Sequence, residues 1–348
     1  MLPRNLYLLF FLFPGLFLYL PFTGAEPEST YLIPDLIPEP PGHLYDVGGY
    51  KLHLNCQGSG QPVILIDSGV GGFSLEWQII QRELSVDYRV CTYDRAGYGW
   101  SDIGPMPRTT KRIASELHIL LGKAAVQPPF IFLGHSFGGY TALYFAENYS
   151  EDIAGVVLID SSHPRQSIRL TAKYIDDDHT SIRSINSYKV IQPALPEHYP
   201  DEFKVLARKF TNSWKSVMTL RDEMKNFSNS GRQIEDSAAI LNIPLVVLSR
   251  GRRVWPEDTS GEAKEKIWSK LQLELANYSK NSSLIIAEKS GHHIHLDQPD
   301  LVVRVTRDLI ASITDSQPID TITCGTDKGK AGDNNYPGCL SYISTPGL

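Results

Sequence analysis

A Gly-His-Ser-Phe-Gly stretch at residues 134–138 carries the clearest chemical signal in this chain. It follows the apolar, β-rich residues 130–133 and precedes residues 140–147, whose apolar positions recur with helical spacing. A serine between a strand and a helix needs small neighbours on a sharp turn, and its hydroxyl then projects from the edge of the sheet. The pattern predicts that Ser136 is a catalytic nucleophile.

A serine hydroxyl needs a general base near neutral pH, and the base needs a third group to orient it. We predict that the base is His292, because Ser-Gly-His at residues 290–292 lies between the last predicted strand and the last predicted helix. That loop should lie at the same sheet edge as Ser136. His293 and His295 are interpreted as loop or core histidines. No metal site is expected there, because no cysteine or carboxylate ligand pattern accompanies the histidines.

The elements that must position these residues alternate between strand and helix. Several of the predicted strands are apolar on both faces, as buried parallel strands are. The predicted strands are residues 51–54, 63–66, 89–93, 130–133, 156–159, 245–248 and 284–287. Between them, apolar residues of 113–121 and 302–310 share helical faces. The pattern predicts the α/β class, with a mostly parallel sheet that is covered on both faces.

One interval interrupts this alternation. About eighty residues separate the strand that ends near Asp160 from the next one near Pro244, too many for a plain crossover. Helix-like stretches at residues 202–210 and 213–224 fill part of the interval. We therefore predict a helical lid at residues 161–242, inserted into a core that consists of residues 43–160 and 243–315.

Three motifs together resemble the α/β-hydrolase superfamily. They are Gly-His-Ser-Phe-Gly-Gly at residues 134–139, Tyr-Asp-Arg-Ala-Gly-Tyr-Gly-Trp-Ser at residues 93–101 and the closing Ser-Gly-His. The resemblance covers roughly residues 43–315 and implies the α/β-hydrolase fold. It also implies hydrolysis through an acyl-enzyme without a cofactor, with esters as the expected substrates. Asp94 and Arg95 within the second motif are interpreted as a structural charged pair in a turn.

The orienting acid departs from the commonest pattern of that superfamily. Its members usually place an aspartate in a Gly-x-x-Asp setting after the strand at 245–248, where this chain has Val254. Glu257 or Asp258 would serve if the loop were shifted. Asp160 is the preferred candidate, because haloalkane dehalogenases and pancreatic-type lipases carry the acid after the preceding strand. The alternative role for Asp160 is to close the turn at the end of that strand.

Acyl transfer also requires two N–H donors for the oxyanion of the tetrahedral intermediate. The superfamily resemblance implies that the residue after the nucleophile, Phe137, supplies one donor. The second would be the N–H of Val70, in the Asp-Ser-Gly-Val-Gly-Gly loop at residues 67–72. This loop usually reads His-Gly-x in the superfamily, so the Asp67-Ser68 pair is a departure. The backbone donor does not depend on it.

Three functions remain open from the sequence. An esterase is the first, and an aminopeptidase that holds a substrate ammonium with Glu202 or Glu223 is the second. The third is an inactive hydrolase fold that serves as a binding module. The formal net charge of -6, with no local basic stripe, argues against a nucleic-acid partner and favours a small-molecule substrate.

The N-terminus predicts export from the cytoplasm. Residues 6–22 are uncharged and almost wholly apolar, follow a start that carries Arg4, and precede small residues at 23–25. This order is typical of a signal peptide at residues 1–25. An uncleaved membrane anchor is the alternative, although Pro14-Gly15 interrupts the apolar run. Residues 26–42 are Pro-rich and acidic and predict an extended linker. The protein is therefore expected to be secreted or to reside in a secretory lumen.

An oxidising compartment allows cysteines to pair. Cys324 and Cys339 lie in a C-terminal tail at residues 316–348 and bracket a polar stretch of it that is too poor in apolar residues to fold by burial, so we predict a disulfide loop there. Cys56 and Cys91 are interpreted as buried thiols or as a bridge between neighbouring strands. Four glycosylation sequons support export weakly; they begin at Asn148, Asn226, Asn277 and Asn281.

Overall fold

The computed structural model describes residues 37–172, 195–235, 241–315 and 339–340. The chain divides into two units, Met1–Pro38 and Glu39–Leu348, and the elements below belong to the second unit. The predicted signal segment, most of the predicted linker, and Cys324 with its predicted disulfide lie outside the described residues. Within those residues no helix is both long and apolar enough to cross a membrane.

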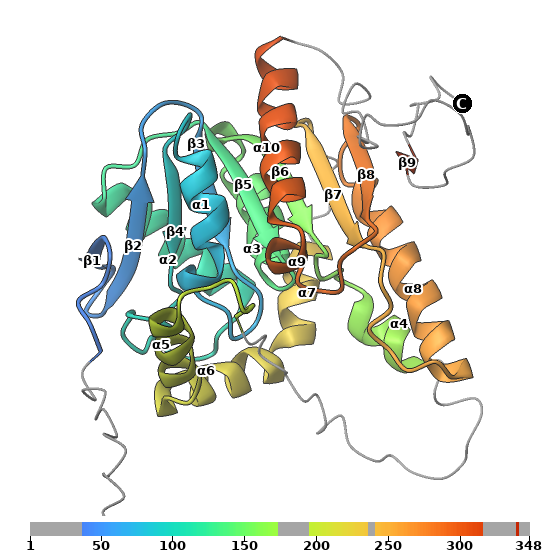
Figure 1. The fold of residues 1–348 in the computed structure, drawn as a ribbon, viewed down its shortest axis with the longest axis horizontal. Helices are drawn as coiled ribbons and strands as arrows, with labels where there is room; N and C mark the ends of the chain where they lie inside the picture. The colour runs from blue at the N-terminus through green and yellow to red at the C-terminus, as the bar shows by residue number, and fades with distance from the viewer. Residues whose placement is uncertain (1–36, 173–194, 236–240, 316–338, 341–348) are drawn as a thin grey trace, which may run out of the picture. The chain divides into compact units, whose positions relative to one another are not determined.

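Among the described residues, nine strands form one sheet in the order β1-β2-β4-β3-β5-β6-β7-β8-β9 (Figure 1). The central strands from β4 to β8 pair in parallel, whereas β1, β2 and β9 pair antiparallel at the two edges. The strands are β1 His43–Asp46, β2 Lys51–Gln57, β3 Val63–Asp67, β4 Val90–Tyr93, β5 Phe130–His135, β6 Ile153–Ile159, β7 Leu245–Arg250, β8 Ser282–Ala287 and β9 Cys339–Leu340. All seven predicted strands are present, which confirms the predicted class; β1 and β9 were not predicted.

Helices cover both faces of this sheet. Helices α1 and α10 pack together on one face, while α2, α3 and α8 cover the other. They are α1 Gln78–Leu84, α2 Thr110–Lys123, α3 Gly138–Asn148, α8 Thr259–Ala276 and α10 Pro299–Thr314, with the short η1 Ser74–Trp77, η2 Ser150–Asp152 and α9 Ile294–Asp297 between elements.

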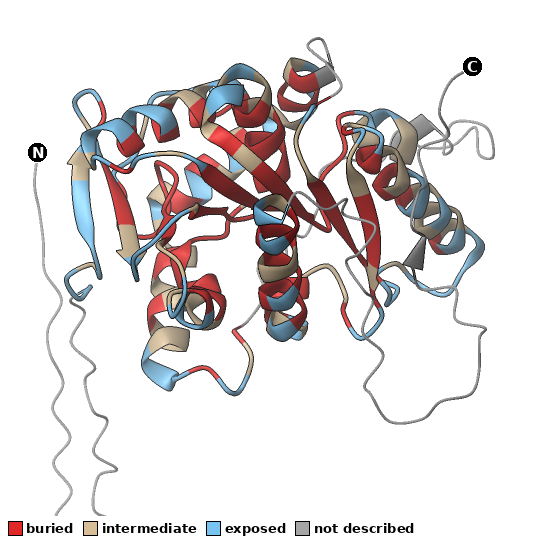
Figure 2. Cartoon of the chain, turned by 90° about the horizontal axis from the view of Figure 1, so that it is seen from above, coloured by how far each residue is buried: buried red, intermediate tan, exposed pale blue. Residues whose placement is uncertain are grey.

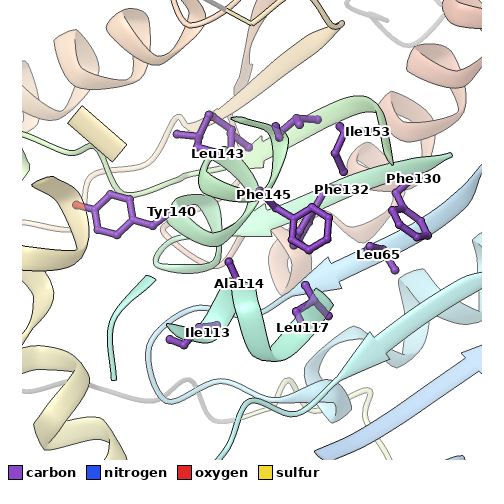
Figure 3. Packing of buried hydrophobic residues seen from close by; sticks show 14 of the residues in the cluster. Leu65, Ile113, Ala114, Leu117, Phe130, Phe132, Tyr140, Leu143, Phe145 and Ile153 are labelled. Atoms are coloured by element: carbon purple, nitrogen blue, oxygen red, sulfur yellow. The ribbon is translucent and has the colours of Figure 1, made fainter. Parts of the chain in front are cut away.

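Alternation along the strands divides the core into two apolar layers. Successive strand side chains point to opposite faces, so Leu65 and Phe132 pack with α2 and α3 (Figure 3), whereas Ile66 and Leu133 pack with α1 and α10. Strands β3 and β5 are buried along their whole lengths. The central strands and the inner helix faces are buried, while the edge strand β1 and the outer helix faces are largely exposed (Figure 2). The sheet is therefore a rigid platform for the loops at its ends.

In the described residues between β6 and β7, which are 160–172, 195–235 and 241–244, the chain forms four helices where the sequence predicts the inserted lid. They are α4 Gln166–Ala172, α5 Asp201–Thr211, α6 Trp214–Lys225 and α7 Phe227–Glu235. Leu206 and Phe210 of α5 pack against Phe73 and Tyr98 of the core, in loops that follow β3 and β4. The predicted helical stretches at 202–210 and 213–224 correspond to α5 and α6. The lid function of the insertion stays a prediction.

A disulfide joins Cys56 of β2 to Cys91 of β4. The two residues are register partners in an antiparallel pair, which brings their side chains together. Of the two alternatives that the sequence left for these cysteines, the structure has the bridge. A disulfide is consistent with an oxidising compartment.

Candidate active site

Ser136 lies on a strained turn between β5 and α3. Its φ is 50°, in the left-handed region, which costs on the order of 1–3 kcal/mol for a residue with a side chain. Gly138 is required on the far side of the turn, because a Cβ there would collide with the backbone of Asp67. The turn leaves Ser136 partly exposed at the carboxyl edge of the sheet, while its neighbours His135 and Phe137 are buried.

His292 contacts both Ser136 and Asp160. Its Nε2 lies 3.0 Å from Ser136 Oγ, and its Nδ1 lies 2.6 Å from Asp160 Oδ2. With Asp160 ionised, Nδ1–H donates to the carboxylate, which leaves Nε2 free to accept the serine proton. The structure thus brings together the three side chains that the sequence selected from three separate loops.

Asp160 is fully buried and receives four hydrogen bonds. Oδ1 accepts from the Arg250 backbone N–H at 3.1 Å and from Trp268 Nε1 at 2.8 Å, and Oδ2 accepts from Arg250 Nη1 at 3.0 Å besides His292. Burial by itself raises the pKa of Asp160, but the Arg250 charge and the donated hydrogen bonds outweigh it and place that pKa below its ordinary value. The carboxylate is therefore ionised and fixed in orientation.

The alternative acids, Glu257 and Asp258, lie elsewhere. Glu257 is exposed, and Asp258 caps α8 by accepting a 2.6 Å hydrogen bond from the Gly261 N–H. The end of β7, next to the position where the superfamily usually has its aspartate, is occupied by Arg250. In this chain the carboxylate comes from the end of β6 and the neighbouring strand supplies a cation.

Three further histidines surround His292. His135 is buried, and its Nε2–H donates to the His292 carbonyl at 2.9 Å, which anchors the loop that carries the base. Burial lowers the pKa of His135 well below its ordinary value, and that of His293 to about 4, so both are neutral near pH 7. His295 stacks on Trp77 at 4.4 Å, as a core histidine. Within the described ranges no cluster of His, Cys, Asp or Glu could hold a metal ion.

The predicted oxyanion donors, the N–H groups of Val70 and Phe137, belong to two segments that pass close to each other at Gly69 and Ser136. A Cβ on Gly69 would come within 2.9 Å of His135 Nδ1 and 3.2 Å of Ser136 Cβ, so the loop after β3 passes directly beside the nucleophile. In the described part of the chain, the N–H groups of Val70 and Phe137 take no part in the backbone hydrogen bonds of turns and loops. Both are thus available to a ligand.

Arg95 fixes the loop that carries Val70. Its Nη1 donates to Asp67 Oδ1 at 2.7 Å and to the Ser68 carbonyl at 2.5 Å, and its Nη2 donates to the Gly69 carbonyl at 2.6 Å. Its Nε donates to Glu223 Oε1 of α6 at 3.1 Å. One buried guanidinium therefore connects the loop at residues 67–72, called the oxyanion loop below, to the inserted helices.

These contacts correct two interpretations of the sequence. Glu223 also accepts from the Tyr98 hydroxyl at 2.8 Å and is fully buried, so its carboxylate is not free to hold a substrate ammonium. Glu202 is exposed on α5. Asp94 and Arg95 bond to different partners rather than to each other: Asp94 Oδ2 lies 2.8 Å from His53 Nδ1. Both side chains are buried and hydrogen-bonded in the turn, each with its own partners.

Sequence reasoning did not identify Arg250, Trp268 or His135 as parts of the site. No local motif marks Arg250 or Trp268, because their partner Asp160 is about ninety and a hundred positions away. His135 carried a usable signal, since it directly precedes the predicted nucleophile in the sequence.

Comparison with known proteins identifies the family of this chain. A model of the alpha/beta hydrolase fold family matches residues 61–239. The uncharacterized protein YqjL of Bacillus subtilis is 28% identical over 260 residues, which cover 74% of this chain and 87% of that protein. An AB hydrolase superfamily protein of Gibberella zeae is 29% identical over 285 residues, covering 72% and 86%.

Solved structures share the fold. A putative lipase from Acinetobacter baumannii superposes with a TM-score of 0.61 at 20% identity, covering 79% of this chain and 92% of that one. The epoxide hydrolase CorEH gives a TM-score of 0.58 at 16% identity, covering 78% and 98%. The chain belongs to the α/β-hydrolase fold family. This assignment supports hydrolysis of a small molecule.

Proposed function

We propose that this protein is an exported serine hydrolase that cleaves carboxylic esters through an acyl-enzyme. The chain of hydrogen bonds from Asp160 through His292 to Ser136 carries the proposal. Esterases and a putative lipase among the structural neighbours favour an ester substrate. The apolar N-terminal residues 6–22 and the Cys56–Cys91 disulfide support export.

In the acylation step, Ser136 Oγ attacks the ester carbonyl carbon while His292 Nε2 takes the hydroxyl proton. The carbonyl π bond opens onto oxygen, and the N–H groups of Val70 and Phe137 stabilise the resulting oxyanion. His292 then gives its proton to the leaving alkoxide as the C–O bond breaks. Asp160 keeps the imidazole oriented and stabilises its charged form.

Deacylation repeats these steps with water as the nucleophile. Water adds to the acyl carbon and loses a proton to His292, and Ser136 leaves with that proton restored. The products are a carboxylic acid and free enzyme. The rigid sheet and the loops tied by Arg95 and His135 hold the reacting groups in place throughout.

Replacement of Ser136 tests the proposal. Ser136→Ala should lower ester turnover by on the order of a millionfold and abolish labelling by a fluorophosphonate, with the fold intact, because it deletes one hydroxyl. Ser59→Ala is the matched control, since Ser59 is exposed and distant in sequence from the motif. Near-full activity of Ser136→Ala would refute the serine mechanism. Wild-type protein that binds esters without reacting would instead identify a binding module, and preference for aminoacyl amides would identify a peptidase.

A further inference from the structure

Arg250 makes contacts that the hydrolase mechanism above does not explain. Its guanidinium carbon lies 4.7 Å from the Trp255 ring centre and 4.6 Å from that of Trp268, and its Nη2 donates to Glu265 Oε2 at 3.0 Å. These three contacts would be enough to pack a buried arginine. Yet Nη1 reaches beyond them to Asp160 Oδ2, the same oxygen that faces His292.

We propose that Arg250 is a positioning residue that holds the Asp160 carboxylate towards His292 and keeps the site active at acidic pH. The inference rests on the proposed function, because it concerns the same serine, histidine and aspartate. Arg250 and the imidazole compete for one carboxylate oxygen. The guanidinium is permanently charged, so it disfavours a second positive charge on the neighbouring ring.

Other groups around His292 do not replace this effect. From β5 the ring faces Ser136 and the neutral His135, and from its own loop it faces the neutral His293. From α8 it meets the uncharged Trp268 ring at 6.1 Å. Glu265 of α8 lies on the far side of the guanidinium and accepts from it. Arg250 is thus the cation that shares the carboxylate with the base.

The pH dependence of activity tests this role. Without the guanidinium, Asp160 stabilises the protonated imidazole more strongly. As the pH is lowered, His292 would then become protonated, and stop acting as a base, at a higher pH than in the wild type. Arg250→Met should therefore move the acid limb of kcat/KM, and of fluorophosphonate labelling at Ser136, upward by roughly one pH unit or more. Arg250→Lys keeps a positive charge and should largely keep the wild-type limb.

Two further variants separate charge from packing. Trp268→Phe removes a donor to Asp160 Oδ1 without changing charge, so it should lower turnover at every pH and leave the limb in place. Arg253→Met is the matched control, because Arg253 lies three residues after Arg250 in the loop that follows β7, is exposed, and donates to the Pro256 carbonyl rather than to Asp160. It should leave both turnover and pH profile unchanged.

The outcomes distinguish this inference from the proposed function. A folded Arg250→Met enzyme with the wild-type acid limb would overturn the role of Arg250 while Ser136 still labels. Failure of the wild-type protein to label would overturn both proposals. If Arg250→Met does not fold, Arg250→Gln removes the charge with less loss of polar contact and carries the same expectation. An NMR titration of the His292 ring in these variants reads the effect without turnover.

Discussion

Two buried arginines flank the site, and each is paired with two carboxylates. On the side of the site where Asp160 lies, called the acid side below, Arg250 contacts Asp160 and Glu265. On the side of the loop that carries Val70, called the oxyanion side, Arg95 contacts Asp67 and Glu223. Burying a charge is tolerated only when it is paired and hydrogen-bonded, which both arginines satisfy through several donors. The two arginines differ in the elements of the fold that supply their carboxylate partners.

The partners of Arg250 come from core elements, at the end of β6 and on α8. Arg95 instead holds the carbonyls of the loop after β3 and takes its second carboxylate, Glu223, from inserted helix α6. The charged partners on the acid side therefore come from outside the insertion, although α4 of the insertion contacts α8 through the 2.6 Å Arg169–Glu274 ion pair. On the oxyanion side, Arg95 takes one of its two carboxylates from the insertion itself. A rearrangement of α6 would reach the oxyanion loop through one side chain.

The largest effect is expected on the acid side. Asp160→Asn keeps the shape but favours the wrong imidazole tautomer, so turnover should fall by roughly four orders of magnitude in steady-state ester assays. Glu257→Gln and Asp258→Asn are the controls and should be mild, because neither side chain contacts His292. The reverse ranking would show that the loop after β7 supplies the acid in solution.

On the oxyanion side, Arg95→Met should lower kcat by about a hundredfold with little change in KM. The Ser68 and Gly69 carbonyls lose their donor, so the Val70 N–H is less well placed for the oxyanion, and losing such a donor outright costs about 10²–10³ in kcat. Arg95→Lys should recover part of the rate. A rise in KM alone would indicate that Arg95 shapes a binding surface instead.

Glu223→Gln tests whether the insertion is coupled to this side only. Removing one partner of a buried ion pair should lower the free energy of unfolding by about 3–5 kcal/mol, measured by denaturant titration. Turnover should fall, yet the acid limb of the pH profile should stay at the wild-type value. If the acid limb of the pH profile moved as it does in Arg250→Met, the charges around Arg95 and those around Arg250 would not act separately.

A last effect, on stability rather than turnover, is expected at Glu76, which is buried beside the loop that follows β3. Burial raises the pKa of Glu76 to about 8, against a counteracting Arg95 charge. The folded protein therefore keeps a proton that the unfolded chain releases, and stability should decline as pH rises from about 4.5 to 8, by up to about 1.4 kcal/mol per pH unit. Glu76→Gln should flatten this decline in melting temperature. An unchanged slope would contradict the raised pKa.

The turn that carries Ser136 and the candidate base His292 could be predicted because their sequence signals are local. Residues 130–147 contain a strand, a tight turn and a helix in sequence, and the turn tolerates only small flanking residues. His292 could be placed because a loop after a parallel strand must open at the carboxyl edge of the sheet. Several of the predicted strands could be recognised for a similar reason, since burial on both faces leaves an unbroken apolar run, as in β3 and β5.

Long-range partners were decided only by the tertiary structure. Which carboxylate meets His292 depends on which strand ends are neighbours, and the sequence left Asp160, Glu257 and Asp258 open. The pairing of Arg95 with Glu223 joins residues 128 positions apart, and no periodicity records such a contact. The sequence by itself determined which segments form strands and helices and which of the loops between them carry the candidate catalytic side chains, because backbone sterics and burial act locally. The packing of the sheet and helices then determined the partner of each buried charge, because a buried charge pairs with an opposite charge that is close in space, whatever its distance in the sequence.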